Sequence, residues 1–271
     1  MRRSSGWLKH HSLLAFFVLA YAISWASWPA YASGLIPRME FLPVGPLVAA
    51  TIVIALTDGR AGFRAWGWRL IRWRVGLVWY AVALLLPVVL VLAAGLINMA
   101  AGAPAPGLGQ LTWSGLVTVF GVRMVNLLDG PLGEEPGFRG YALPLLQASR
   151  PPLLSAAVLG VLVALWHLPL ILFGGLSLTG LPTTFAITFL YVWLFNRTGG
   201  SVLLTFLFHN SQGTLTMGSF GFTGPDATRV ELIYCMVVVL AVLATLVLDR
   251  QTWRRAPRRA AGVGPFPLRR Q

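Results

Sequence analysis

Residues 75–99 read VGLVWYAVALLLPVVLVLAAGLINM and contain no charged side chain. A helix crosses the hydrocarbon core of a bilayer with about 20 mainly apolar residues. This stretch is long enough to do so, and its proline is compatible with a membrane helix, where neighbouring groups satisfy the freed carbonyl. It therefore predicts a membrane-spanning helix.

The composition of the whole chain agrees with that prediction. Of the 271 residues, 56% are hydrophobic and 11% are charged. A water-soluble domain carries about 25% charged residues, because its surface must be solvated. The chain has too few charges to cover a soluble protein of this size, so its outer surface is expected to face lipid.

Further apolar stretches along the chain also suit membrane helices, although some of them are short. We therefore predict an all-α fold, a polytopic transmembrane helical bundle of about eight spans. The predicted spans are residues 12–33, 41–57, 75–99, 111–128, 153–173, 181–195, 201–217 and 231–248. The bundle then occupies residues 12–249, between a basic N-terminal segment at 1–11 and a basic cytoplasmic tail at 250–271.

The basic residues form short clusters between the predicted spans. The formal net charge is +13, from 21 Lys and Arg against 8 Asp and Glu. The clusters do not make one patch, which argues against a nucleic-acid partner. Cytoplasmic loops are enriched in Lys and Arg, so we predict a multi-pass protein of the plasma membrane with both termini cytoplasmic. The basic residues on that side are Arg2, Arg3, Lys9, Arg60, Arg64, Arg69, Arg72, Arg74, Arg139, Arg150, Arg197, Arg254, Arg255, Arg258, Arg259, Arg269 and Arg270.

The N-terminal stretch has an alternative interpretation as a signal peptide. Basic residues precede an apolar run, and residues 30–32 (AYA) resemble a signal-peptidase site. The run is long for a signal peptide and carries Trp25 and Trp28 near its far end, which favours a retained anchor. The sequence has one cysteine, Cys235, so no intramolecular disulfide is possible.

Two adjacent glutamates follow the fourth predicted span, in the sequence GEEPGFRG at 133–140. In a continuous helix Glu135 and Arg139 share one face, whereas Glu134 points about 100° away. Pro136 removes a helical hydrogen bond, so a kink or a helix restart is expected here. One arginine neutralises one carboxylate, which leaves the other available as a general base. The alternative is an ion pair at a loop edge, with both acids hydrated by the headgroup region.

Two of the four histidines, His167 and His209, lie inside apolar stretches. Ionisable groups within membrane helices are costly, and they mark functional sites by default. Together with the glutamate pair they indicate an acid–base or metal site. The alternative is that each histidine makes only a hydrogen bond between helices. The zinc-protease sequence H-E-x-x-H is absent.

Arg123, Asn126 and Asp129 recur every three residues just before the glutamates. We favour pairing of these residues with one another or with neighbouring helices. The alternative is that Arg123 compensates the charge of an acid in the site.

The predicted boundaries leave Glu134 and His167 far apart. Glu134 stands at the inner end of the fourth span and His167 about fourteen residues into the fifth, a difference in depth of about 20 Å. Either the fourth span extends to about Arg139, or residues 140–149 lie along the interface and the fifth span begins later. We expect the glutamates to lie deeper than these boundaries place them.

The order Glu134-Glu135-x-x-x-Arg139, then His167, then His209 resembles the CPBP family. This family comprises the CAAX prenyl proteases of the second type and bacterial relatives, including bacteriocin-processing and self-immunity proteins. The resemblance is densest over residues 111–217, and the eight-span count also suits the family. It implies an intramembrane endopeptidase.

The family's functional residues carry over to the matching positions. The resemblance implies that Glu134 activates the attacking water, that His167 positions or activates this water, and that His209 stabilises the oxyanion with a nearby amide. Glu135 and Arg139 match the supporting pair. The family has been described both as metalloproteases and as metal-independent glutamate proteases. We favour no obligatory cofactor, and the alternative is zinc held by Glu134, His167 and His209.

Two positions depart from the family pattern. Val163 stands where the family often has Phe, four residues before the first histidine. Gly213 stands where it usually has Asn or Asp, four residues after the second histidine. Asn210 and Gln212 are supporting candidates, because Gln212 shares a helical face with His209 and could supply the missing amide.

The predicted function is an intramembrane endopeptidase that cleaves membrane-associated or lipidated peptides near the cytoplasmic face by glutamate-activated water. Its partners are then a peptide or membrane-protein substrate and the lipid bilayer. The alternative is a non-catalytic membrane partner or bacteriocin self-immunity factor on the same scaffold, which would tolerate changes at Glu134. A proton-coupled transporter ranks third, because the sequence shows no internal repeat.

Overall fold

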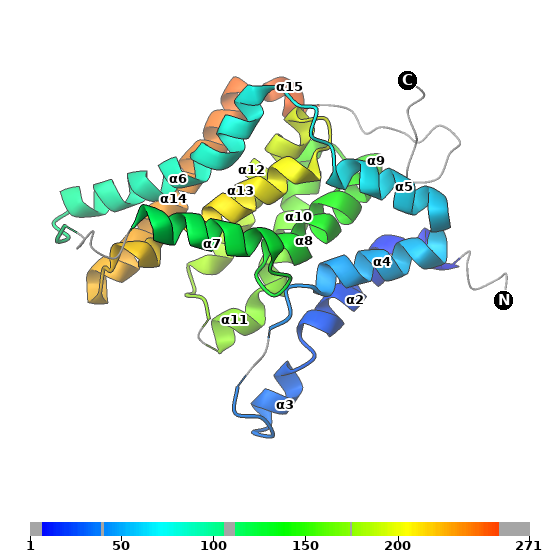
Figure 1. Ribbon diagram of the computed structural model, residues 1–271, viewed down its shortest axis with the longest axis horizontal. Coiled ribbons are helices and arrows are strands. Elements are labelled where there is room, and N and C mark those ends of the chain that lie inside the picture. Colours follow the sequence, from blue (N-terminus) through cyan, green and yellow to red (C-terminus); the bar gives the residue numbers. More distant parts are fainter. Residues whose placement is uncertain (1–6, 39–40, 106–111, 174, 255–271) are drawn as a thin grey trace.

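The computed structural model describes residues 7–38, 41–105, 112–173 and 175–254, and within these ranges every regular element is helical. This confirms the predicted all-α class (Figure 1). Residues 1–6 of the predicted N-terminal segment and residues 255–271 of the predicted basic tail lie outside the described residues. The elements are α2 (Ser12–Ser24), α3 (Trp28–Ala32), α4 (Gly45–Thr57), α5 (Gly59–Leu70), α6 (Leu77–Ala100), α7 (Trp113–Val125), α8 (Pro131–Gly137), η2 (Phe138–Ala142), α9 (Leu143–Ser149), α10 (Pro152–Trp166), α11 (Leu168–Leu172), α12 (Gly180–Arg197), α13 (Val202–Thr214), η3 (Met217–Phe220), α14 (Gly224–Leu248) and α15 (Arg250–Trp253).

Each of the predicted membrane stretches contains a helix. Two of these helices, α6 and α14, are long and apolar enough to cross a membrane on their own. The helices α2, α4, α7 and α10 are apolar but shorter. The apolar helices suit a membrane protein, whereas the number of eight spans stays a prediction.

The structure adds a helix that the predicted spans left out. The elements α8, η2 and α9 follow one another without a break from Pro131 to Ser149. Residues 140–149 therefore continue the helix that carries the glutamates, and they do not form a separate segment. The proline that suggested a boundary lies inside this helix, and the backbone accommodates it by a change of helix type.

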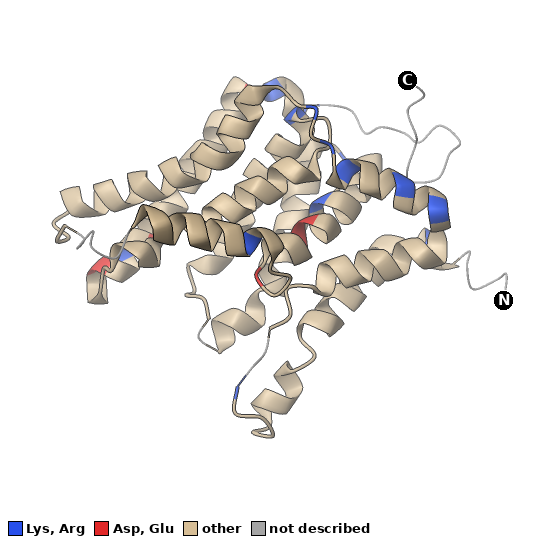
Figure 2. Cartoon of the chain, in the orientation of Figure 1, with Lys and Arg blue, Asp and Glu red and all other residues tan. Residues whose placement is uncertain are grey.

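One end of the bundle collects most of the basic residues described, and we call it the basic end. Arg72 Nε donates to Thr198 O at 3.2 Å, and Arg197 Nε lies 3.4 Å from the Asp249 carboxylate. These contacts place the start of α6, the α12–α13 turn and the end of α14 side by side. Figure 2 shows Lys and Arg on α5 and around this end of the bundle.

The opposite end of the long helices is held by a smaller polar cluster. Asn98, at the end of α6, donates through Nδ2 to Asp226 O at 3.1 Å. Its Oδ1 accepts from Arg229 Nε at 2.7 Å, at the start of α14. The two long helices are therefore antiparallel neighbours, tied at both ends.

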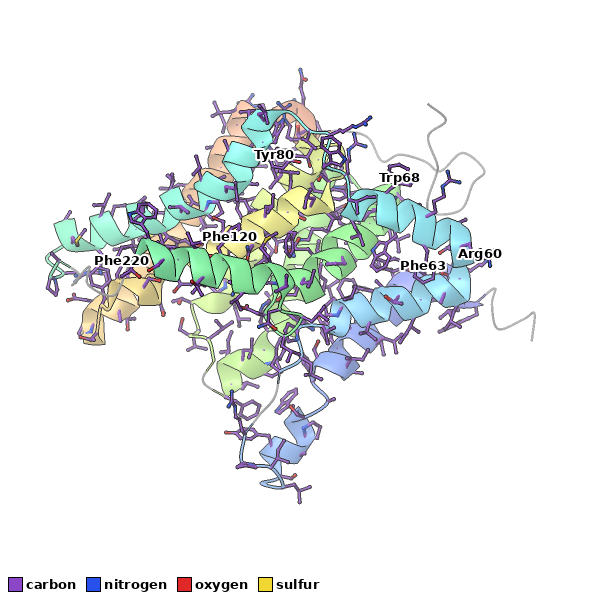
Figure 3. The ribbon with its side chains drawn as sticks, in the orientation of Figure 1. Arg60, Phe63, Trp68, Tyr80, Phe120 and Phe220 are labelled. Atoms are coloured by element: carbon purple, nitrogen blue, oxygen red, sulfur yellow. The ribbon has the colours of Figure 1, made fainter. Side chains whose placement is uncertain are left out.

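The basic loop after the second predicted span is largely helical. The helix α5 buries Gly62, Ala65 and Trp66 against the bundle. It exposes Arg60 and Trp68 on its outer side (Figure 3). Opposed apolar and basic faces, with Trp on the exposed side, are typical of a helix that lies in the membrane interface.

Candidate active site

A stripe of glycines holds the glutamate helix close to its neighbours. A Cβ on Gly133 would lie 2.3 Å from Pro43 O, and one on Gly137 would lie 2.5 Å from Pro46 O. Small residues four apart allow such close backbone approach in membrane helices. Because each residue turns the helix by about 100°, Glu135 falls about 200° from Gly133 and faces away from α4.

Pro136 changes the helix type without ending the helix. The backbone widens into a π turn at η2, where Leu143 N donates to Phe138 O. Trp66 Nε1, on α5, donates to Pro136 O at 2.9 Å. A π turn within an α-helix is frequent at functional sites. The predicted kink or restart is thus a π turn braced by an indole from the neighbouring helix.

The Glu135 carboxylate is completely buried and has two cationic or donor neighbours. Its Oε1 accepts from Arg139 Nη1 at 3.0 Å, as the spacing of four residues predicted. The same oxygen lies 2.9 Å from His209 Nδ1. Because a carboxylate accepts, His209 Nδ1 carries the proton in this contact, and the other ring nitrogen, Nε2, faces away from Glu135.

His167 stands at the junction of α10 and α11. Its Nδ1 lies 2.8 Å from Val163 O, the carbonyl one turn earlier, so Nδ1 carries a proton and Nε2 is left unprotonated in the neutral ring. The ring also stacks near Phe41, with centroids 6.4 Å apart. Val163, a departure from the family pattern, thus orients this histidine through its backbone.

The longer helix brings Glu134 and His167 to the same level. Glu134 lies 16 residues before Arg150, at the turn between α9 and α10, and His167 lies 17 residues after it. Two antiparallel helices with equal numbers of residues from their turn place these positions side by side. The expected difference of about 20 Å in depth arose because residues 140–149 were not assigned to a helix.

One small cavity contains all three predicted catalytic residues. Its volume is about 60 Å³, enough for a few water molecules. The walls come from α8, α10, α12 and α13, so four helices that are separate in the sequence meet there. The lining residues are Glu134, Arg139, Val163, His167, Thr184, Ile187, Thr188, Tyr191, His209 and Gln212.

Gly130 borders the space between Glu134 and His209. Its φ is +41°, in the region that favours glycine. A Cβ at this position would lie 3.1 Å from Glu134 Oε1 and 3.3 Å from His209 Nε2. One small group can therefore contact both atoms at once, and a side chain on residue 130 would occupy that position.

Tyr191, on α12, connects several site residues and was not identified from the sequence. The Arg139 guanidinium carbon lies 4.0 Å from the centre of the Tyr191 ring, in a cation–π contact. The Tyr191 hydroxyl donates to Gln212 Oε1 at 2.6 Å. This bond directs the amide of Gln212 within the cavity wall, where sequence reasoning placed a substitute for the missing amide. A tyrosine in an apolar stretch gives no signal of this role.

The other supporting candidate, Asn210, faces a different way. It is fully buried, and its Nδ2 donates to Phe120 O on α7 at 3.1 Å. It does not line the cavity among the described residues. Asn210 therefore ties α13 to α7, and its supporting role in the site stays a prediction.

The proposed zinc ligands do not form a ready metal site. Among the described residues, no three His, Cys, Asp or Glu side chains are grouped so as to hold a metal ion. His209 uses Nδ1 for Glu135, and His167 uses Nδ1 for Val163. Each ring keeps Nε2 free, as a metal-bound histidine does, so zinc would need Glu134 and both Nε2 atoms to move to about 2 Å from one point.

The fold and the cavity define the class: a helical membrane protein in which a glutamate and two histidines line one small cavity. The particular family follows from a comparison with family models. The model described as type II CAAX prenyl endopeptidase Rce1-like matches residues 118–213, about a third of the chain. The match supports a CPBP family intramembrane protease and CAAX-type protease activity in general. No curated protein matches the chain.

Proposed function

We propose that this chain is an intramembrane endopeptidase in which Glu134 activates water. The observation that carries the proposal is the small cavity lined by Glu134, His167 and His209 together. Within the described residues no ion pair holds Glu134, whereas Glu135 is bound by both Arg139 and His209. The two adjacent acids therefore differ in role, and Glu134 is the one able to accept a proton.

The first step is attack of water on the scissile carbonyl carbon. Glu134 takes one proton of the water as the oxygen–carbon bond forms, and His167 Nε2 orients the water by accepting its other hydrogen. The carbonyl oxygen becomes an oxyanion. The His209 imidazolium, stabilised by Glu135, donates through Nε2, and the Gln212 amide donates beside it.

The second step is collapse of the tetrahedral intermediate. The carbon–nitrogen bond breaks, and the proton held by Glu134 passes to the leaving amine. The products are a carboxylic acid and an amine, and Glu134 returns to its ionised form. Tyr191 and Arg139 keep Gln212 and Glu135 in place during both steps.

The side of entry follows from the basic end. His209 lies nine residues from Gly200, and Glu134 lies 16 residues from Arg150, which are path lengths of about 13 Å and 24 Å along the two helices. The cavity therefore lies within the bundle, about 13–24 Å along the helices from the basic end. With eight spans and both termini inside, the scissile bond must be drawn into the membrane from the cytoplasmic side.

Replacing Glu134 by glutamine tests the proposal. We expect Glu134→Gln to lower cleavage by about 10²–10⁴-fold with an unchanged melting temperature, because the side chain keeps its shape and loses only the base. The measurement is mass-spectrometric detection of products from transmembrane and farnesylated peptides in proteoliposomes. Glu231→Gln, which changes a glutamate bonded to Thr179 outside the cavity, is the matched control.

The same experiment separates the leading proposal from a non-catalytic partner. A partner or immunity factor needs only its surface, so full cellular function in Glu134→Gln would transfer support to that alternative. Chelation tests the cofactor. We expect cleavage to survive exhaustive chelation, and loss of cleavage that zinc restores would show that the site rearranges to bind metal.

A further inference from the structure

The guanidinium of Arg123 occupies the space beside Gly213. A Cβ on Gly213 would lie 2.1 Å from Arg123 Nη2 and 2.3 Å from its Cζ. Contacts this short are not sterically possible, so a side chain at 213 displaces the guanidinium, which is the far end of a flexible side chain. Gly213 stands one helical turn after His209, on the same face of α13. Arg123 can therefore pack in this position because residue 213 has no side chain.

Arg123 also fixes the loop that leads into the site. Its Nη1 forms an ion pair with Asp129 Oδ1, and both side chains are mostly shielded, with 13% and 33% of their area exposed. Asp129 is followed directly by Gly130, which borders Glu134 Oε1 and His209 Nε2. Arg123 thus joins the α13 backbone, beside His209, to Asp129. The next residue, Gly130, has no side chain and so leaves room beside both Glu134 and His209.

The rest of α7 gives this loop little support. No residue of α7 is buried, all of them being described, and its residues Val117 and Val125 are 69% and 76% exposed. Phe120 lies on this helix (Figure 3), and its carbonyl accepts from Asn210. Two further contacts among the described residues connect α7 to the region of the site. They are the Arg123–Asp129 ion pair and the packing of Arg123 on Gly213.

We propose that Arg123 is a positioning residue that sets the distance between Glu134 and His209 through Asp129 and Gly130. The proposal rests on the proposed function. The ion pair and the notch at Gly213 hold residue 130 against both catalytic side chains. Loss of either contact lets the loop withdraw, which widens the space in which water and the substrate carbonyl must be aligned. A displacement of about 1 Å at a reacting group lowers the rate by about 100-fold.

A double-mutant cycle tests this inference. Arg123→Ala removes the guanidinium, and Gly213→Ala expels it, so both variants break the same contact from opposite sides. We expect each to lower kcat for the cleaved peptide by about 100-fold, with KM changed by less than about twofold. The double variant should also lose about 100-fold, whereas independent effects would multiply to about 10⁴-fold.

Two further variants separate positioning from a general loss of structure. Gly121→Ala adds the same methyl group to α7 at a position with no neighbour within 4 Å, and it should keep the parent kcat. Arg123→Lys keeps the charge opposite Asp129 and should recover part of the loss. If Arg123→Ala does not fold, the comparison of Gly213→Ala with Gly121→Ala decides the matter alone.

Failure of this inference differs from failure of the proposed function. If Glu134→Gln abolishes cleavage while Gly213→Ala and Arg123→Ala keep the parent kcat, Arg123 has no positioning role. The inference is also overturned if the loss of kcat in the double variant equals the product of the losses in the two single variants. If Glu134→Gln itself cleaves at the parent rate, the proposed function fails first.

Discussion

The helix that carries the glutamates and the helix before it are neighbours in sequence and opposites in packing. Every residue from 133 to 143 is buried, and glycines bring this segment close to α4 and α5. In α7, every side chain is at least partly exposed. The two segments are separated by a loop of only five residues, 126–130.

This difference in burial indicates that the glutamate helix is rigidly held, whereas α7 can move more easily. A buried charged segment must be held on all sides, because an unpaired ion in a low-dielectric interior is costly. A helix that faces lipid on most sides contributes few contacts and can shift at little cost. Gly130 lies between these two segments. It packs next to the glutamate helix, and the loop 126–130 connects it to α7.

The largest expected effect is that of Glu135→Gln. It removes the anion that Arg139 and His209 share, so the buried Arg139 and the partly buried His209 lose their charge partner. We expect the free energy of unfolding to fall by roughly 3–5 kcal/mol, measured by thermal unfolding in detergent. Glu134→Gln is the isosteric control. Equal stability of the two variants would mean that both acids are alike, which contradicts the asymmetry described.

The next effect tests the glycine stripe. Gly137→Ala places a methyl group 2.5 Å from Pro46 O, so α4 and the glutamate helix must separate. We expect a loss of about 1–3 kcal/mol, typical of overpacking, as well as lower cleavage activity. Gly121→Ala on α7 should be neutral or slightly stabilising, because alanine favours helix. A neutral Gly137→Ala would show that the stripe does not define the helix position.

A smaller effect is expected at the brace from α5. Trp66→Phe keeps most of the ring volume but removes the bond to Pro136 O. We expect a loss of about 1 kcal/mol from the missing hydrogen bond and the polar group left behind. Hydrogen exchange of the amides in η2 should also become faster. Unchanged exchange there would mean that the π turn is stable without its brace.

The smallest effect is expected on the exposed helix. Val117→Ala shortens a side chain that is 69% exposed, so it removes few contacts within the protein. We expect a change within about 0.5 kcal/mol in the free energy of unfolding. A larger loss would indicate that α7 is covered by a partner and would reduce the contrast between the two helices.

Much of the helical framework and the core of the site could be predicted from the sequence. Apolar length alone located a helix in each predicted membrane stretch, because lipid imposes a length requirement on each helix separately. The spacing of four predicted the ion pair of Glu135 and Arg139, and the spacing of the triplet predicted that of Arg123 and Asp129. Both contacts are local. The helical period is sufficient for the first, whereas the second joins the end of α7 to the loop that follows it.

The remainder depends on contacts between distant segments. Tyr191 and Thr188 reach the cavity from α12 only because that helix packs on α10, which no local pattern encodes. Gly213 appeared to be a lost amide, and its role beside Arg123 depends on the placement of α7. The helix from Pro131 to Ser149 was missed because proline and charge were given more weight than the glycine spacing of four.

Several helices close to the glutamates are short. The helices α4 and α10 have 13 and 15 residues, lengths of about 20 Å and about 23 Å, whereas the hydrocarbon core of a bilayer is about 30 Å thick. A bilayer that matches such helices is compressed beside them, and a compressed layer admits polar groups more readily. We therefore expect cleavage to depend on acyl-chain length, with shorter lipids easing the entry of both water and peptide.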